Sequence, residues 1–192
     1  MTKEEELQQV AREIEACSAC KVGTKGKAVP GEGNPDAKIV FVGEAPGRQE
    51  AVTGKPFIGK SGQLLRTAIR SSGLSEDAVF ITSVGKYLPT AGTPSASQIA
   101  HGTLHLQKQL AIIKPKVIVL LGAVAVKGVL GEKLSIASLH GKICEKEGVA
   151  YFITFHPAAG LRFPPLRHLF LQDFSTLQSY LHNNGLLFHK SY

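Results

Sequence analysis

Two side chains in the first third of the chain, Glu44 and Phe57, have types and spacing suited to a pocket for a planar substrate. Glu44 follows the apolar run 39–42, which is typical of a strand covered on both faces. Ligands bind where such strands end, at the carboxyl edge of an open α/β sheet. Glycines and a proline constrain the backbone around Glu44, and Phe57 stands between a proline and a glycine-rich turn. A carboxylate and a stacking ring are therefore predicted to share one pocket.

A second loop with reactive side chains follows the last apolar strand, 151–155. It begins with His156 and continues to Leu161 and Arg162. In a parallel sheet this loop reaches the same carboxyl edge as Glu44. There, His156 can donate a hydrogen bond to an oxygen that gains negative charge. An isolated His-Pro pair more often simply ends a strand, but the pairing with Glu44 favours a functional role.

The segment Gly54–Ser61 matches the phosphate-loop pattern G-x-x-x-x-G-K-[ST] in every position. A phosphate loop leaves a buried strand and opens a helix, so that its amides face the phosphates. A helix is expected over 63–71, but residues 48–53 are predicted to form a polar connection instead of a strand. The apolar strand 117–121 also ends in glycine, where a magnesium-binding Asp is expected. A nucleotide hydrolase is therefore the less favoured alternative.

The composition indicates one globular domain, residues 1–192, with 43% hydrophobic residues. No run of about 18 apolar residues occurs, and the first six residues are too acidic for a signal peptide. We therefore expect a cytoplasmic, monomeric protein without a membrane partner. The 22 Lys and Arg residues exceed the 15 Asp and Glu residues, and the calculated pI is about 9.4. A basic surface of this kind supports a nucleic-acid partner.

Helical and strand patterns alternate along the chain. Helices are predicted over 4–16, 63–71, 95–113, 123–130 and 166–181, and strands over 39–42, 78–84 and 117–121, with a hairpin over 142–155. This alternation implies an α/β fold in which helices cover both faces of a mainly parallel sheet.

Several motifs taken together resemble the uracil-DNA glycosylase superfamily, most closely its family four, the bacterial and archaeal branch. They are Cys17-x-x-Cys20, Gly43-Glu44-Ala45-Pro46-Gly47, Gly54-Lys55-Pro56-Phe57-Ile58-Gly59, the segment 112–118 and His156-Pro157-Ala158-Ala159. The resemblance covers nearly the whole chain. It implies a three-layer α/β/α sandwich around a four-stranded parallel sheet, and cleavage of the N-glycosidic bond that joins uracil to DNA.

The resemblance also implies roles for individual residues. Glu44 would orient or activate the attacking water and stabilise the cationic sugar, while His156 would hydrogen-bond the uracil oxygen as the base departs. The base-binding positions are Gly43, Ala45, Phe57 and Ser83. These residue types suit the reaction, because glycosidic cleavage spreads positive charge on the sugar and negative charge on the base. A stacking ring such as Phe57 recovers part of the cost of extruding the base, which is a few kcal/mol.

DNA contacts are predicted for Lys60, Ser61, Lys86, Leu161, Arg162 and Arg167. Leu161 is suited to enter the gap left in the base stack, and the two arginines to contact phosphates. Ordinary packing or a solvated charge explains each of these residues equally well.

Ser83 departs from the family pattern, in which an Asn at this position reads the polar edge of uracil. A hydroxyl donates or accepts single hydrogen bonds but cannot reproduce the bidentate geometry of an amide. The substrate is therefore expected to be DNA that contains uracil or a related deaminated base, with the preferred base left open.

The family's iron-sulfur cluster uses four cysteines, of which Cys17 and Cys20 match the first two. The third and fourth positions match Tyr87 and Gly102, neither of which supplies a thiolate. We therefore expect the [4Fe-4S] cluster to be absent and no other cofactor to be required.

A zinc site is an alternative use of the Cys17 and Cys20 pair, since His101 and His105 would add suitable ligand types. Histidines on a basic helix are more often surface residues, so this alternative is less favoured. The third cysteine, Cys144, falls in the predicted hairpin, away from the matching positions.

Three hypotheses of function follow. The favoured one is an active DNA glycosylase. The second is a DNA-binding homologue with weak or lost catalysis, motivated by the departures at positions 83, 87 and 102. The third is the nucleotide hydrolase that would use Gly54–Ser61.

Overall fold

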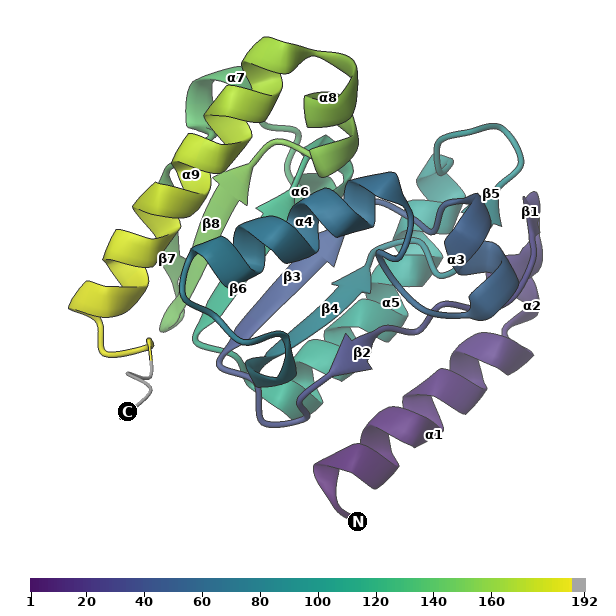
Figure 1. Cartoon of the computed structure of the whole chain (residues 1–192). Coiled ribbons are helices and arrows are strands. Elements are labelled where there is room, and N and C mark those ends of the chain that lie inside the picture. The colour runs from purple at the N-terminus through teal and green to yellow at the C-terminus, as the bar shows by residue number, and fades with distance from the viewer. Residues whose placement is uncertain (188–192) are drawn as a thin grey trace.

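A six-stranded sheet forms the centre of the protein in the computed structural model, which describes residues 1–187 (Figure 1). In spatial order its strands are β2 (Glu32–Gly33), β4 (Val79–Ser83), β3 (Ile39–Gly43), β6 (Val117–Leu121), β8 (Val149–Thr154) and β7 (Ile143–Lys146). The four inner strands run parallel, and the two edge strands pair antiparallel. The predicted α/β sandwich with a mainly parallel sheet is confirmed, and the four expected strands are its parallel part.

Helices cover both faces of the sheet (Figure 1). One face carries α4 (Lys60–Ser71) and α9 (Pro164–Asn183), and the other carries α5 (Ala96–Ile113) and α6 (Ala123–Leu130). Because successive strand side chains point to opposite faces, Phe41 packs toward α4 and α9, whereas Val40 packs toward α5 and α6. No helix in the described part of the chain is long and apolar enough to cross a membrane.

The amino-terminal segment packs outside α5. It comprises α1 (Lys3–Ala16), α2 (Ser18–Lys21) and β1 (Thr24–Lys25), which pairs with β5 (Leu88–Pro89). Capping boxes fix the starts of α1 and α5: Thr2 and Glu5 close the first, and Ser95 and Gln98 close the second. The remaining short elements are η1 (Glu76–Ala78), α7 (Ile136–Leu139) and α8 (Pro157–Arg162).

The sequence predicted a polar connection over residues 48–53, and this prediction is wrong. These residues form the helix α3 (Arg48–Thr53). Gly47 caps its start and Gly54, in the left-handed conformation at φ +81°, ends it. The next helix, α4, begins at Lys60 and is three residues longer at its start than the pattern indicated. The segment before the phosphate-loop pattern is thus a helix, and not the buried strand that such a loop requires.

Helix α5 lies directly on the end of β4 at Gly102. A Cβ atom added to Gly102 would stand 2.1 Å from the carbonyl oxygen of Val84, which is far inside the van der Waals limit. A glycine is therefore required for this helix to approach the strand so closely.

We expect Gly102→Ala to destabilise the protein by about 1–3 kcal/mol, because the added methyl group must push α5 away from Val84. Helix propensity alone would favour Ala by about 1 kcal/mol. A loss of stability would therefore show that the steric contact with Val84 outweighs helix propensity. Urea unfolding measures it. Leu104→Ala, at an exposed position of the same helix, is the control and should change stability little. An unchanged or raised midpoint for Gly102→Ala would contradict the close contact.

Candidate active site

A pocket of about 460 Å³ opens at the carboxyl edge of the parallel strands. Glu44 follows β3, Ser83 ends β4, and His156 follows β8. All three line the pocket together with Phe57 and Ala45. The structure thus brings together the carboxylate, the ring and the imidazole that the sequence placed in two distant loops.

Phe57 forms one wall of this pocket in an unusual backbone conformation, with φ at +51°. Its ring lies on Gly43, where a Cβ atom would stand 2.3 Å from the ring atom Cζ. Its carbonyl group faces Gly62, where a Cβ atom would stand 2.0 Å away. Gly43 does not itself line the pocket, and its lack of a side chain gives the Phe57 ring its place.

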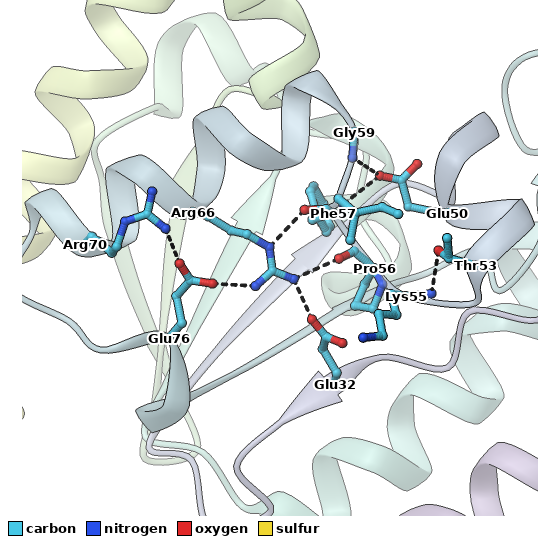
Figure 2. Close-up of polar contacts among 11 residues, drawn as sticks. Glu32, Glu50, Thr53, Lys55, Pro56, Phe57, Gly59, Arg66, Arg70 and Glu76 are labelled. Atoms are coloured by element: carbon cyan, nitrogen blue, oxygen red, sulfur yellow. Dashed lines mark hydrogen bonds and ion pairs between the residues drawn. The ribbon is translucent and has the colours of Figure 1, made fainter.

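Arg66, on α4, holds the backbone on either side of the Phe57 peptide (Figure 2). Its Nε donates to the carbonyl oxygen of Phe57 and its Nη2 to that of Pro56, both at 3.0 Å. Glu32 and Glu76 each form a 2.5 Å ion pair with the same guanidinium. The Arg66 side chain is only 19% exposed, so these interactions fix both the arginine and the loop.

Glu50, on α3, holds the same loop from its other side (Figure 2). Its Oε1 accepts hydrogen bonds from the backbone amides of Ile58 at 2.9 Å and Gly59 at 2.8 Å. Both amides belong to the segment that matches the phosphate-loop pattern. A protein carboxylate therefore occupies donors that a nucleotide phosphate would need, which is a further argument against that alternative.

His156 is a neutral hydrogen-bond donor in this site. Its Nδ1 accepts from the amide of Ala158 at 3.2 Å, so the proton of the neutral ring lies on Nε2. Burial lowers the pKa of His156 to about 4, because a charged imidazole is poorly solvated there. Nε2 is buried and has no hydrogen-bond partner among the described residues. The ring centroid lies 6.1 Å from that of Phe57.

Glu44 is half-buried in the same pocket, and burial raises the pKa of its carboxyl above that of an exposed glutamate. Ser83 is 4% exposed and also lines the pocket. A carboxylate, a neutral imidazole and a hydroxyl thus face one space beside an aromatic ring.

All but one of the residues predicted to contact DNA either line the pocket or are exposed. Ser61 and Arg162 line the pocket, whereas Lys60 and Arg167 are exposed. Leu161 is 45% exposed on α8.

Phe163, which the sequence interpretation gave no role, is 56% exposed and lines the pocket beside these residues. The sequence feature that could have indicated Phe163 is its position directly before the two prolines that start α9.

The exception is Lys86, for which the prediction of a DNA contact is wrong. The residue is 2% exposed. Its Nζ donates to Ser83 O at 2.7 Å, to Gln109 Oε1 at 2.8 Å and to Thr82 Oγ1 at 2.9 Å. Burial lowers the pKa of Lys86 to about 7. Lys86 therefore fixes the loop that follows β4 from inside.

Tyr87 and Gly102 stand at the positions expected for the third and fourth cysteines of an iron-sulfur cluster, and both make other contacts. Tyr87 is 5% exposed and donates its hydroxyl to Ile14 O at 3.3 Å, and Gly102 packs on Val84. Two thiols, those of Cys17 and Cys20, remain. The residues present do not fit a cluster that needs four thiolates.

One expectation about the histidines is corrected: His105 is not a surface residue but is only 9% exposed. Its ring lies near both thiols, since the potential ligand atoms of Cys17, Cys20 and His105 are all within 4.8 Å of one another. His101 does not belong to this group, and Cys144 is exposed on β7.

The fold and the pocket together place the chain among the α/β proteins that have a ligand-sized pocket at the carboxyl edge of a parallel sheet. Comparison with known proteins narrows this class. Residues 30–177 match the family model of the uracil DNA glycosylase superfamily. The chain is 40% identical over 184 residues to the type-4 uracil-DNA glycosylase of Sulfurisphaera tokodaii, covering 90% of this chain and 83% of that protein.

Two further relatives have the same name. The type-4 uracil-DNA glycosylase of Thermotoga maritima is 38% identical over 190 residues, covering 96% of this chain and 99% of that protein. That of Archaeoglobus fulgidus is 39% identical over 183 residues, covering 90% and 92%. The chain therefore belongs to the uracil DNA glycosylase superfamily and to its type-4 family.

We expect Arg66→Met to destabilise the protein by about 2–4 kcal/mol, because it leaves Glu32 and two carbonyl groups without their donor and removes one of the two arginines that pair with Glu76. Arg70→Met is the matched control. Arg70 lies one turn further along α4, is 57% exposed and also pairs with Glu76, so its loss should cost under about 1 kcal/mol. Urea unfolding of both variants measures the difference. Equal losses would show that Arg66 does not hold the Phe57 loop.

Proposed function

We propose that this protein removes uracil, or a related deaminated base, from DNA by hydrolysing its N-glycosidic bond. The observation that carries the proposal is the meeting of Glu44, Phe57 and a neutral His156 in one pocket of a type-4 family member. We further infer that residues 1–192 act as one domain and as a monomer.

The target base enters the pocket after rotating out of the DNA stack, which costs a few kcal/mol. Stacking on Phe57 recovers part of that cost. The ring is suited to this task because its backbone is fixed by Arg66 and Glu50, so little further ordering is needed when the base binds.

His156 stabilises the leaving base. As the glycosidic bond breaks, its electrons move to the base nitrogen, and negative charge spreads to the base oxygens. The Nε2–H of His156 has no other partner among the described residues and is free to donate to such an oxygen. A fixed donor in a water-poor site stabilises charge that develops in the transition state more than it stabilises the ground state.

Glu44 acts on the sugar side of the bond. Its carboxylate stabilises the positive charge that develops on the sugar and orients a water molecule toward C1′. The water oxygen bonds to C1′, the bond from C1′ to the base nitrogen breaks, and the water proton passes to Glu44. The raised pKa of Glu44 makes it a stronger base than an exposed glutamate.

DNA is held at the rim of the pocket. Leu161 and Phe163 are exposed apolar side chains beside the pocket and suit insertion into the gap that the extruded base leaves. Lys60, Arg162 and Arg167 supply positive charge for phosphates, with Ser61 as a further polar contact.

Recognition of the base rests on Ala45 and on Ser83, whose single hydroxyl replaces an amide that would form two hydrogen bonds. The oligonucleotide panel described below therefore compares uracil with other deaminated bases. We also infer that the protein works without a four-iron cluster, because Tyr87 and Gly102 supply no thiolates.

An oligonucleotide panel tests the function. Single- and double-stranded DNA with uracil, hypoxanthine or xanthine is incubated with the protein, and abasic sites are cleaved with alkali. We expect cleavage at one or more of these bases. Glu44→Gln and His156→Gln should each reduce the single-turnover rate by about 10²–10⁴-fold. The exposed controls Glu132→Gln and His168→Gln should retain it.

Two other outcomes would overturn the proposal. DNA binding without cleavage of any substrate would identify a binding homologue that has lost catalysis. Magnesium-dependent ATP binding that is lost in Lys60→Ala would support the nucleotide hydrolase.

The pH dependence of the single-turnover rate separates the two catalytic side chains. Glu44 acts as a carboxylate, so the rate should fall as the pH drops through its raised pKa, with a midpoint higher than that of an exposed glutamate. His156 has a pKa of about 4 and stays a neutral donor above that value, so the imidazole adds no second midpoint between about pH 5 and 8. Glu44→Gln should remove the midpoint, and His156→Gln should retain it at a lower rate. A midpoint lost in His156→Gln would reverse the assignment.

A further inference from the structure

Cys17, Cys20 and His105 lie together at the contact between the amino-terminal segment and α5. Cys17 ends α1 and caps α2, Cys20 lies within α2, and His105 lies on α5. α2 packs on α5, which brings the three potential ligand atoms within 4.8 Å of one another.

These separations are close to those around a tetrahedral metal ion. Zinc binds thiolate sulfur at about 2.3 Å and imidazole nitrogen at about 2.0–2.1 Å, which places neighbouring ligand atoms about 3.5–3.8 Å apart. Closing the group around an ion thus requires side-chain shifts of about 1 Å. The Cys-x-x-Cys spacing presents both sulfurs from one short turn, as in many zinc sites.

His105 provides a second, independent observation. The side chain is nine-tenths buried, and its Nδ1 is shielded from solvent without a hydrogen-bond partner in the described part of the chain. Buried polar atoms nearly always have a partner, so an unpaired nitrogen on an imidazole ring that lies near two thiols points to a missing ligand. A bound metal ion would supply an interaction for this buried ring.

The charge of the group suits a divalent ion. Two thiolates neutralise Zn²⁺, so the occupied site carries no net charge. This matters because the buried ammonium group of Lys86 acts electrostatically on both Cys20 and His105. A zinc ion bound by two thiolates has no net charge and therefore adds no positive charge to the interior around Lys86.

We propose that Cys17, Cys20 and His105 bind one Zn²⁺ ion, with a water molecule as the fourth ligand. Two thiolates and one imidazole are ligand types that favour zinc over the harder ions magnesium, calcium and manganese. The ion ties α1 and α2 to α5, next to the loop that follows β4. This inference does not rest on the proposed glycosylase activity, since binding is measured without DNA.

Cobalt titration tests the site directly. The reduced protein is stripped of metal with a chelator, and Co²⁺ is added as a spectroscopic probe. One equivalent should give the intense visible bands of a tetrahedral ion and a sulfur-to-cobalt charge-transfer band, and Zn²⁺ should displace both. Metal analysis of protein expressed with added zinc should give one zinc per chain.

Variants identify the ligands. Cys17→Ser, Cys20→Ser and His105→Gln should each weaken metal binding on the order of 100-fold or more. Cys144→Ser and His101→Gln are matched controls, because these residues lie outside the group, and should leave it unchanged. His105→Cys should retain tetrahedral Co²⁺ with stronger charge transfer, which gives a positive readout if other variants fold poorly.

The proposal fails if Co²⁺ gives no tetrahedral spectrum with the reduced wild-type protein. It also fails if the control variants weaken binding as much as the ligand variants. Iron with acid-labile sulfide in the purified protein would show an iron-sulfur cluster and would likewise overturn it.

Discussion

The left-handed backbone of Phe57 is the constraint on which the candidate active site depends. A bulky residue rarely adopts a positive φ, and this conformation persists only when its surroundings fix it. Arg66 and Glu50 do so from opposite sides, one binding carbonyl groups before the turn and the other binding amides after it. Gly43 and Gly62 leave the room that the ring and its carbonyl group occupy. Four residues without a role in the chemistry thus define the wall against which a base can stack.

Burial shifts the pKa values of Glu44 and His156 in opposite directions. The same loss of solvation raises the pKa of Glu44 and lowers that of His156, because in each case it disfavours the charged form. Above the raised pKa of Glu44, one pocket contains both a basic carboxylate and a neutral N–H donor. Paired groups whose environments move their pKa values in opposite directions are a common basis for assigning acid, base and donor roles.

The sequence predicted the parts of the site that depend on strand order. Glu44 and His156 each follow an apolar strand, and parallel strands bring their carboxyl ends to one edge, so their meeting followed from local patterns. Glu50 and Arg66 were missed because their partners are backbone groups of a loop whose conformation no periodic pattern reveals. Lys86 was misassigned because a lysine in a polar loop usually reaches solvent, whereas this one finds four internal acceptors. Tertiary contacts, and not residue type, decided each of these cases.

The departures from the family pattern at Ser83, Tyr87 and Gly102 belong to one physical region. Lys86 donates hydrogen bonds to the carbonyl group of Ser83 and to the side chain of Gln109 on α5. Tyr87, the next residue, fills space among α1 and Cys20, and Gly102 allows α5 to lie on Val84. The loop from Ser83 to Tyr87 is thus held by packing and by the hydrogen bonds of the buried Lys86 side chain. Because this loop also presents Ser83 to the pocket, a change in how the amino-terminal segment is anchored acts on a residue that lines the pocket.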